Sequence, residues 1–240
     1  MLSRKVVEIG AGRGFFKHPQ FKPSGDSPDV PVMPETLLLL ELNAQACSVD
    51  LREMTQVVLG DPGATIQILR EGGRECSFGE EPPNRIEDCI SALGVRTCIE
   101  AVSRRIVSRA MNKPAIMRAW SHSRKIAETC KLIAEEASQN IDPNEAYLTG
   151  LLHELGTLPA ILDWAPALAV SSDPVLTGLR LAEEWFLPQC VVEYFSEPGH
   201  QRGVGRWTGI VQCAHEISES WSDGSQFDGK QESRVVAFGQ

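Results

Sequence analysis

Positive charge is scarce in this sequence. Its 240 residues carry 23 Lys and Arg against 32 Asp and Glu, which gives a formal net charge of −9. A protein that binds phosphate backbones or an anionic membrane surface needs a basic face. The composition therefore predicts neither a nucleic-acid partner nor a membrane partner.

Paired cysteines and long apolar runs are missing as well. The seven cysteines are scattered and contain no C-x-x-C pair, which argues against a zinc finger or a disulfide framework and favours a reducing compartment. Cys89 and Cys130 lie on apolar stripes and are expected to be small core residues. The most apolar stretch, 148–170, is interrupted by His153, Glu154 and two prolines, whereas a membrane span needs about 20 apolar residues. The start of the chain does not resemble a signal peptide, so we expect a cytoplasmic protein.

Strands with alternating apolar and polar residues are also missing. Apolar residues instead recur at helical spacing, as Ile126, Cys130 and Ile133 do on one predicted helix face. The sequence therefore predicts an all-α fold. Helices are expected at 37–42, 48–59, 61–73, 86–93, 95–110, 115–138, 142–155, 174–186 and 206–221.

Several residues are expected to fix helix ends and helix contacts. The side chains of Ser48, Asp61 and Asp142 stand where N-caps are needed, and the last two precede a proline suited to a first helical turn. Gly156 is expected to end the helix that begins after Asp142. Gly150 is expected to let two helices approach closely.

Composition divides the chain into three parts. Residues 1–34 are rich in glycine, proline and basic residues and have no helical period, so we expect an extended arm or leader. Helical patterning continues from 35 to 221 and divides into an N-terminal bundle at 35–110 and a C-terminal bundle at 115–221. The link between them is short, which predicts that the bundles pack as one unit. Residues 222–240 are expected to form a loose tail.

A glycine motif lies inside the predicted arm. Glu8, Gly10, Gly12 and Gly14 form E-x-G-x-G-x-G, similar to the first motif of Rossmann-like methyltransferases, in which glycines let a cofactor approach the backbone. That motif needs a strand before it and a helix after it. Prolines follow here instead, so a glycine-rich leader is the favoured interpretation and a methyltransferase the alternative.

Five segments in order resemble landmarks of the HDOD family, a regulatory offshoot of the HD phosphohydrolases. Trp120-Ser-His-Ser123 begins a long predicted helix, and Ala146-Tyr-Leu-Thr-Gly-Leu-Leu-His-Glu-Leu-Gly156 is similar to the family's A-F-x-A-G-L-L-H-D-I-G. The remaining segments are Val58-Leu-Gly-Asp-Pro-Gly-Ala-Thr-Ile-Gln-Ile-Leu69, Ile86-Glu-Asp-Cys-Ile-Ser-Ala-Leu-Gly94 and Glu184-Trp-Phe-Leu-Pro188. The resemblance implies that 35–221 is one HDOD-like domain whose C-terminal bundle is HD-like.

The resemblance also implies a set of candidate metal ligands. In catalytic HD proteins, histidines and aspartates hold a divalent metal that activates water against a phosphate. His122 and His153 match the two histidines of that set, Glu154 stands in place of an aspartate, and His215 stands in place of the last one. Histidines that catalytic members carry after the W-x-L-P landmark are missing. These departures predict a remnant of a metal site, with the two histidines and Glu154 paired as buried polar groups.

Two functions follow from this resemblance. The first is a non-catalytic signal-transduction module that binds a signalling protein through its helical surface, with no catalytic residue and no cofactor. The alternative is a metal-dependent phosphohydrolase acting on a nucleotide or a cyclic dinucleotide, with a divalent metal held by His122, His153, Glu154 and His215. A homo-oligomer is compatible with both.

Overall fold

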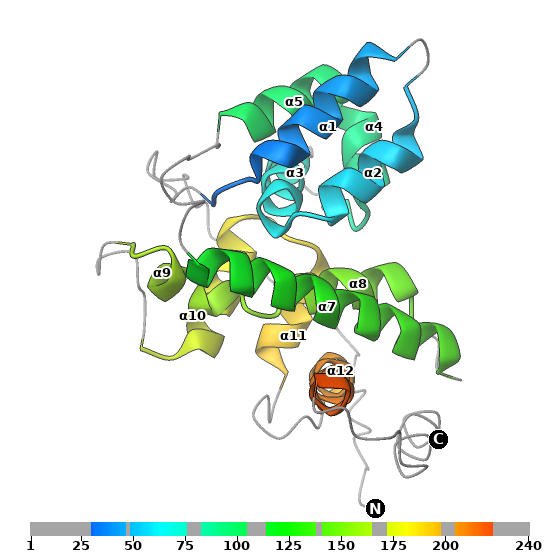
Figure 1. Ribbon diagram of the computed structural model, residues 1–240. Helices are drawn as coiled ribbons and strands as arrows, with labels where there is room; N and C mark the ends of the chain where they lie inside the picture. The colour runs from blue at the N-terminus through cyan, green and yellow to red at the C-terminus, as the bar shows by residue number, and fades with distance from the viewer. Residues whose placement is uncertain are drawn as a thin grey trace, which may run out of the picture.

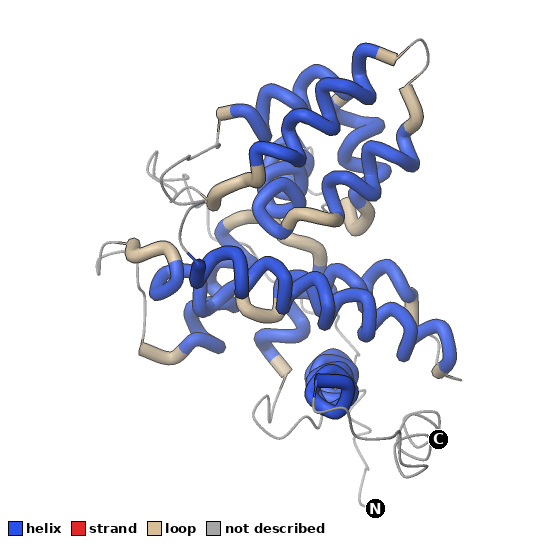
Figure 2. The backbone as a smooth tube through the Cα atoms, viewed as in Figure 1, coloured by secondary structure: helices blue, strands red, loops and turns tan. Residues whose placement is uncertain are grey.

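The computed structural model describes residues 30–46, 49–75, 83–104, 114–137, 141–164, 172–197 and 205–222. Every regular element within these ranges is a helix, and none of them is a strand (Figure 2). The predicted all-α class is therefore confirmed. The glycine motif at 8–14 lies outside the described residues. No helix in the described ranges has the length and apolarity that crossing a membrane requires.

The N-terminal group of helices is built around one buried helix. It comprises α1 (Pro34–Gln45), α2 (Leu51–Leu59), α3 (Pro62–Glu75), α4 (Ile86–Leu93) and α5 (Val95–Ser103). Helix α3 is buried on nearly all sides, because α2, α4 and α5 all pack against it. A helix with so little exposed surface forms the centre of a bundle rather than its rim.

The C-terminal group lies below the first one in Figure 1. It comprises α7 (Pro114–Glu136), α8 (Pro143–Leu152), the 3-10 helix η1 (Leu155–Thr157), α9 (Leu158–Ile161), α10 (Pro174–Glu184), α11 (Gln189–Ser196) and α12 (Arg206–Ser222). The long helix α7 packs along α8 and is also in contact with α12, which is seen end-on in Figure 1. Three helices thus meet near the middle of α7.

Helix ends differ from the predicted ones in ways that side chains explain. Asp50 caps α2, because its carboxylate accepts hydrogen bonds from the amides of Arg52 and Glu53. The predicted cap, Ser48, lies outside the described residues. Helix α3 continues through Gly72 and Gly73 to Glu75. A Cβ at those glycines would lie 2.8 Å from Cys89 Sγ and 2.6 Å from Phe186 Cβ. The glycines therefore serve close packing and do not end the helix.

Further differences concern the middle and the end of the domain. Helix α8 ends at Leu152 and η1 follows it, so the predicted helix 142–155 is too long by a turn. Helix α5 ends at Ser103, and the rest of its predicted range, 105–110, lies outside the described residues. Helices α9 and α11 were not predicted. Asp142 does cap α8, and its carboxylate accepts from the amide of Asn144 at 2.7 Å.

Residues immediately before α1 belong to the packed core. Val30 and Val32 are fully buried, and the side-chain amide of Gln67 in α3 donates to the carbonyl of Val30 at 3.3 Å. Packing therefore begins before residue 34, whereas residues 1–29 of the predicted arm and 223–240 of the predicted tail lie outside the described residues. The predicted boundary between the arm and the domain at residue 34 stays a prediction.

Asp61 connects the two groups of helices. It caps α3 through the amides of Gly63 and Ala64, and it accepts a hydrogen bond from Trp120 Nε1 on α7 at 3.1 Å. A second connection runs from the Tyr147 hydroxyl on α8 to the carbonyl of Leu59, at 3.0 Å. These bonds cross the boundary between the predicted bundles at buried or half-buried positions.

Candidate metal centre

Three histidines from three different segments converge in the C-terminal group. His122 lies on α7, His153 directly follows α8, and His215 lies on α12. Their ring centroids are 4.9 to 5.3 Å apart. One ring nitrogen of each lies within 4.8 Å of the others. This spacing allows all three imidazoles to contact one ion after small side-chain movements.

The close approach of α7 and α8 brings the first two histidines together. A Cβ on Gly150 would lie 2.8 Å from Cys130 Sγ and 2.9 Å from Ala127 Cα. The missing side chain therefore lets α8 rest directly on α7, as the sequence predicted. His153 follows Gly150 by one turn and faces the same neighbour. On the other side, Lys125 Nζ donates to the carbonyl of Ser218 at 3.1 Å and ties α12 to α7.

The hydrogen bond of His153 sets which of its nitrogens can bind a metal. Its Nδ1 lies 2.7 Å from the carbonyl oxygen of Gly150. Because a carbonyl can only accept, Nδ1 carries the proton and Nε2 carries the lone pair. A backbone carbonyl in this position is the usual partner of a metal-binding histidine. The sequence pattern gave no sign of this contact, because it depends on the turn that follows α8.

Burial favours the neutral form of His215. The pKa of His215 is lowered first by burial and further by the neighbouring His122, while Glu219 on the next turn opposes the shift. Metal ligation requires the unprotonated ring. The chemistry of the donors thus suits a borderline transition metal such as Zn, Co or Ni, which bind imidazole well.

Glu154 does not join the three histidines. Among the described residues that can ligate a metal, the close group contains His122, His153 and His215 and no carboxylate. Glu154 follows the end of α8 in a non-helical conformation. Glu154 lines a pocket with Trp120, Ser123 and residues of α3. Burial raises its pKa, and His122 partly opposes that shift.

The three imidazoles fit a metal, but the set differs from the one the resemblance implied. Three of the four predicted residues form the close group, and the fourth, Glu154, is among the residues that line the neighbouring pocket. An all-imidazole group brings no negative charge to offset that of a divalent ion. The centre therefore resembles a site that binds a metal through neutral nitrogen donors alone.

Sequence reasoning missed two buried residues elsewhere. Asp61 was predicted only as a helix cap, although the indole of Trp120 also bonds to it. Arg70 was not singled out, yet it is 2% exposed within α3. A charged residue within an apolar helical stripe is a signal that would have found it.

The fold and the histidine cluster together define an HD-like helical module. The family model of the HDOD domain matches residues 30–171, more than half of the chain. The chain belongs to the HDOD family. This confirms the resemblance and includes four of the five landmark segments, together with the residues immediately before α1. The fifth segment, 184–188, lies beyond the matched range.

Solved structures of other proteins have the same fold. Two structures of the MmoQ response regulator from Methylococcus capsulatus str. Bath match with TM-scores of 0.65 and 0.67, at 19% and 17% identity, over 88% and 87% of this chain and 92% of theirs. A virulence factor from Campylobacter jejuni matches with a TM-score of 0.52 at 13% identity, over 88% of this chain and 92% of that chain. Among curated proteins, nothing matches significantly. At these identities the likeness concerns the fold.

Proposed function

We propose that this protein is a non-catalytic signal-transduction module that binds a partner protein through the outer face of α1. The observation that carries the proposal is a stripe of exposed leucines on that helix. Membership of the HDOD family and the response regulator among its structural neighbours support a signalling role. The partner is expected to be another signalling protein.

The leucine face consists of Leu38, Leu39 and Leu42, which are 55%, 50% and 56% exposed. Leu42 lies one helical turn after both Leu38 and Leu39, so the three are neighbours on the surface of α1. Thr36, Leu40 and Asn43 are the buried residues of the same helix. Single exposed leucines are ordinary, but a contiguous apolar patch on a described surface marks a protein contact.

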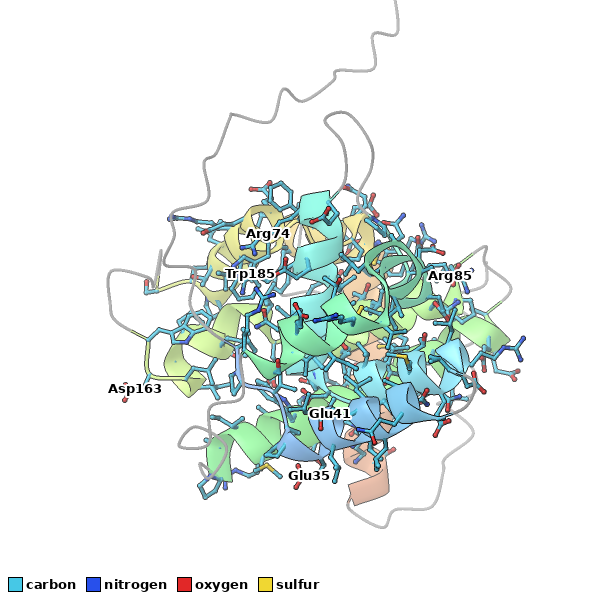
Figure 3. All side chains as sticks on the ribbon, turned by 90° about the horizontal axis from the view of Figure 1, so that it is seen from above. Glu35, Glu41, Arg74, Arg85, Asp163 and Trp185 are labelled. Carbon is cyan, nitrogen blue, oxygen red and sulfur yellow. The ribbon has the colours of Figure 1, made fainter. Side chains whose placement is uncertain are left out.

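Acidic residues flank the leucine face. Glu35 precedes the leucines and Glu41 lies within the same helix, and both are exposed (Figure 3). An apolar centre with a charged rim is typical of a protein interface. The matching surface on the partner would carry apolar side chains surrounded by Lys or Arg.

A site-specific photo-crosslinker tests this surface. Placed at position 39 in cells of the native host, it is expected to give a discrete adduct with another protein. The matched control is position 132 on α7, where Leu132 is 53% exposed and no adduct is expected. Adducts only with a second copy of this chain would instead assign the face to a homo-oligomer, and equal labelling at both positions would reject the proposal.

A metal-dependent phosphohydrolase is the second candidate, and the histidine cluster is the observation that favours it. His122, His153 and His215 would hold the ion, which would supply an activated water when bound. Glu154 is the fourth predicted residue, and burial raises its pKa, which favours the protonated form over the carboxylate that a metal would bind. The lack of a carboxylate within the close ligand group of the described residues supports the non-catalytic proposal.

Metal content and turnover separate the two candidates. Protein purified without chelator is analysed for metals and assayed against a cyclic dinucleotide with added Mn, Co or Zn. We expect no turnover above buffer, and His153→Ala is expected to reduce Co binding at least about tenfold, as loss of a ligand should. Glu154→Gln is the matched control and is expected to keep Co binding. Turnover that His153→Ala abolishes would replace the proposal with the phosphohydrolase.

A further inference from the structure

Arg70 is a buried charge at the junction of the two helix groups. Its side chain lies within α3 and is only 2% exposed. Within the described part of the chain, neither Nη1 nor Nη2 has a hydrogen-bond acceptor. Buried guanidinium groups are normally paired, because an unpaired charge loses its hydration without compensation.

The partner that Arg70 does have is an aromatic ring. Its guanidinium carbon lies 4.6 Å from the ring centre of Trp185, which directly follows α10. The ring attracts the cation, but it offers no acceptor to the N–H groups in the guanidinium plane. Trp185 is itself 2% exposed, and its indole Nε1 also has no acceptor among the described residues.

Among the described residues, the carboxylates nearest to Arg70 in the sequence and at the end of α10 are paired with other arginines. Glu71 lies 3.2 Å from Arg74, and Glu184 lies 3.9 Å from Arg180. Burial, and then Arg74, lower the pKa of Arg70 to about 10, while Glu71 and Glu184 oppose the shift. Arg70 therefore stays positively charged at neutral pH. Figure 3 shows Arg74 and Trp185 at the same end of the molecule.

The hydrogen-bond donors at this junction determine which kind of ligand can bind there. Arg70 Nη1, Arg70 Nη2 and Trp185 Nε1 are all donors, so a complementary group must supply acceptors and negative charge. A guanidinium fork binds two oxygens of a carboxylate or a phosphate. A phosphate has at least one further oxygen, which the indole N–H can bind.

We propose that Arg70 and Trp185 form a binding site for a phosphate group at the junction of the N-terminal and C-terminal helix groups. The phosphate would accept from both Nη atoms of Arg70 and from the indole of Trp185. The site is separate from the histidine cluster and from the leucine face, so it does not depend on the proposed function. Because α3 and the turn after α10 both contribute, the ligand would strengthen the contact between the two groups.

Thermal unfolding of the full chain tests the site. Inorganic phosphate is added up to about 10 mM at constant ionic strength, and a nucleoside monophosphate is tested in a parallel series. We expect the midpoint of unfolding to rise with phosphate and Arg70→Met to weaken apparent binding at least about tenfold, as loss of the only charged ligand should. Arg74→Met, one turn along α3, is the matched control and is expected to keep binding within about threefold. A larger response to the nucleotide would identify a phosphate ester as the ligand.

A second measurement keeps the test decisive if Arg70→Met does not fold. The indole N–H resonance of Trp185, assigned by Trp185→Phe, is followed in the unmodified protein as phosphate is added. We expect it to move in a saturable way, whereas chloride at the same ionic strength leaves it in place. A resonance that phosphate does not move, or an equal rise in unfolding midpoint for Arg70→Met and the unmodified protein, would overturn the proposal.

Discussion

Asp61 is 1% exposed, and its two carboxylate oxygens accept hydrogen bonds from three parts of the chain. Oδ2 binds the amide of Met33 at 2.7 Å and the hydroxyl of Thr36 at 2.9 Å. Oδ1 binds the amide of Gly63 at 2.8 Å and the indole of Trp120 at 3.1 Å. Burial raises the pKa of this carboxyl, and the bonds from these donors oppose the shift. One side chain thus joins the starts of α1 and α3 to α7.

Replacing Asp61 tests that role. Asp61→Ala is expected to lower the free energy of unfolding by about 3 kcal/mol, because several buried donors lose their acceptor at once. Trp120→Phe removes only one of these bonds and is expected to cost about 1 kcal/mol. Urea denaturation measures both changes. Asp50→Ala, at the exposed cap of α2, is the control and should cost about 1 kcal/mol; an equal effect at both aspartates would contradict the role of Asp61.

Buried thiols give a second prediction at the residue scale. Cys98 and Cys190 are at most 3% exposed, and burial raises the pKa of Cys98 to about 11 and that of Cys190 to about 12. Because the thiolate is the reactive form, we expect both to react with a disulfide reagent at pH 8 at least about 100-fold more slowly than in the unfolded chain. Peptide mapping after a timed reaction measures this. Rapid labelling of either cysteine in the native protein would show that its segment opens readily.

Predictability at the residue scale depended on how local the interaction is. The cap at Asp142 follows from neighbours in the sequence, and the structure agrees with it. The packing role of Gly150 was predicted from its residue type, and the structure agrees, but its contacts with Ala127 and Cys130 on α7 could not be named from the sequence. The bond from Trp120 to Asp61 spans 59 positions, and no local pattern encodes it. The motif predicted Glu154 together with the histidines, but the close group of described ligand atoms consists of the three histidines, and Glu154 lines a neighbouring pocket.

At the scale of elements, the contact between α7 and α8 decides where the histidines meet. Alanine normally favours a helix over glycine by about 1 kcal/mol, so propensity alone would make Gly150→Ala stabilising. The added Cβ would, however, lie 2.9 Å from Ala127 Cα and 3.1 Å from Ala127 N. Backbone atoms cannot move aside as a flexible side chain can. Helix propensity and steric contact therefore change the free energy of unfolding in opposite directions at Gly150.

At Gly150 we expect the steric contact of the added Cβ to outweigh the gain in helix propensity. Gly150→Ala should lower the free energy of unfolding by about 2 kcal/mol and weaken Co binding, because α8 must move away from α7 and take His153 with it. Gly72→Ala is the matched control, since its Cβ would meet mainly the Cys89 side chain, at 2.8 Å. Chemical denaturation and Co titration provide the two readouts. Unchanged or higher stability for Gly150→Ala would show that α7 and α8 can separate without cost.

The helices whose sequences carry an apolar stripe and recognisable ends could be predicted with nearly correct bounds. Helices α2, α4 and α7 combine apolar stripes with clear ends, and their predicted ranges agree with the structure within a few residues. Helix α11 begins directly after Pro188 without a side-chain cap, so nothing in the sequence marked its start. The leucine run of α1 indicated a helix, but apolar residues on both its faces did not reveal which side is exposed.

At the scale of the whole molecule, the ordered landmark segments were enough to predict the fold class and the family. They did not predict how the two helix groups sit against each other. That arrangement depends on Asp61 with Trp120, Tyr147 with Leu59 and Arg70 with Trp185. Each pair joins residues far apart in the sequence, and each forms only when both groups are folded. The same contacts determine whether the groups can unfold separately.

Because these contacts are buried or half-buried, we expect the two helix groups to unfold in a single cooperative transition. The positions of the tryptophans make this testable: all five lie at or after residue 120, so α1–α5 contain none. Tryptophan fluorescence therefore reports on the C-terminal group and, through Trp120 and Trp185, on its junction with the N-terminal group. Far-ultraviolet circular dichroism reports on the helices of both groups. The two signals should give the same midpoint and slope in urea.

Asp61→Ala serves as the informative variant for this experiment. Without the bond from Trp120, the N-terminal group loses a buried link to α7, so circular dichroism should begin to change at lower urea than fluorescence does. Asp50→Ala affects only the exposed cap of α2 and should keep the two curves superimposed. Separate transitions in the unmodified protein would mean that the contacts across the junction contribute little, and the helix groups would then be independent folding units.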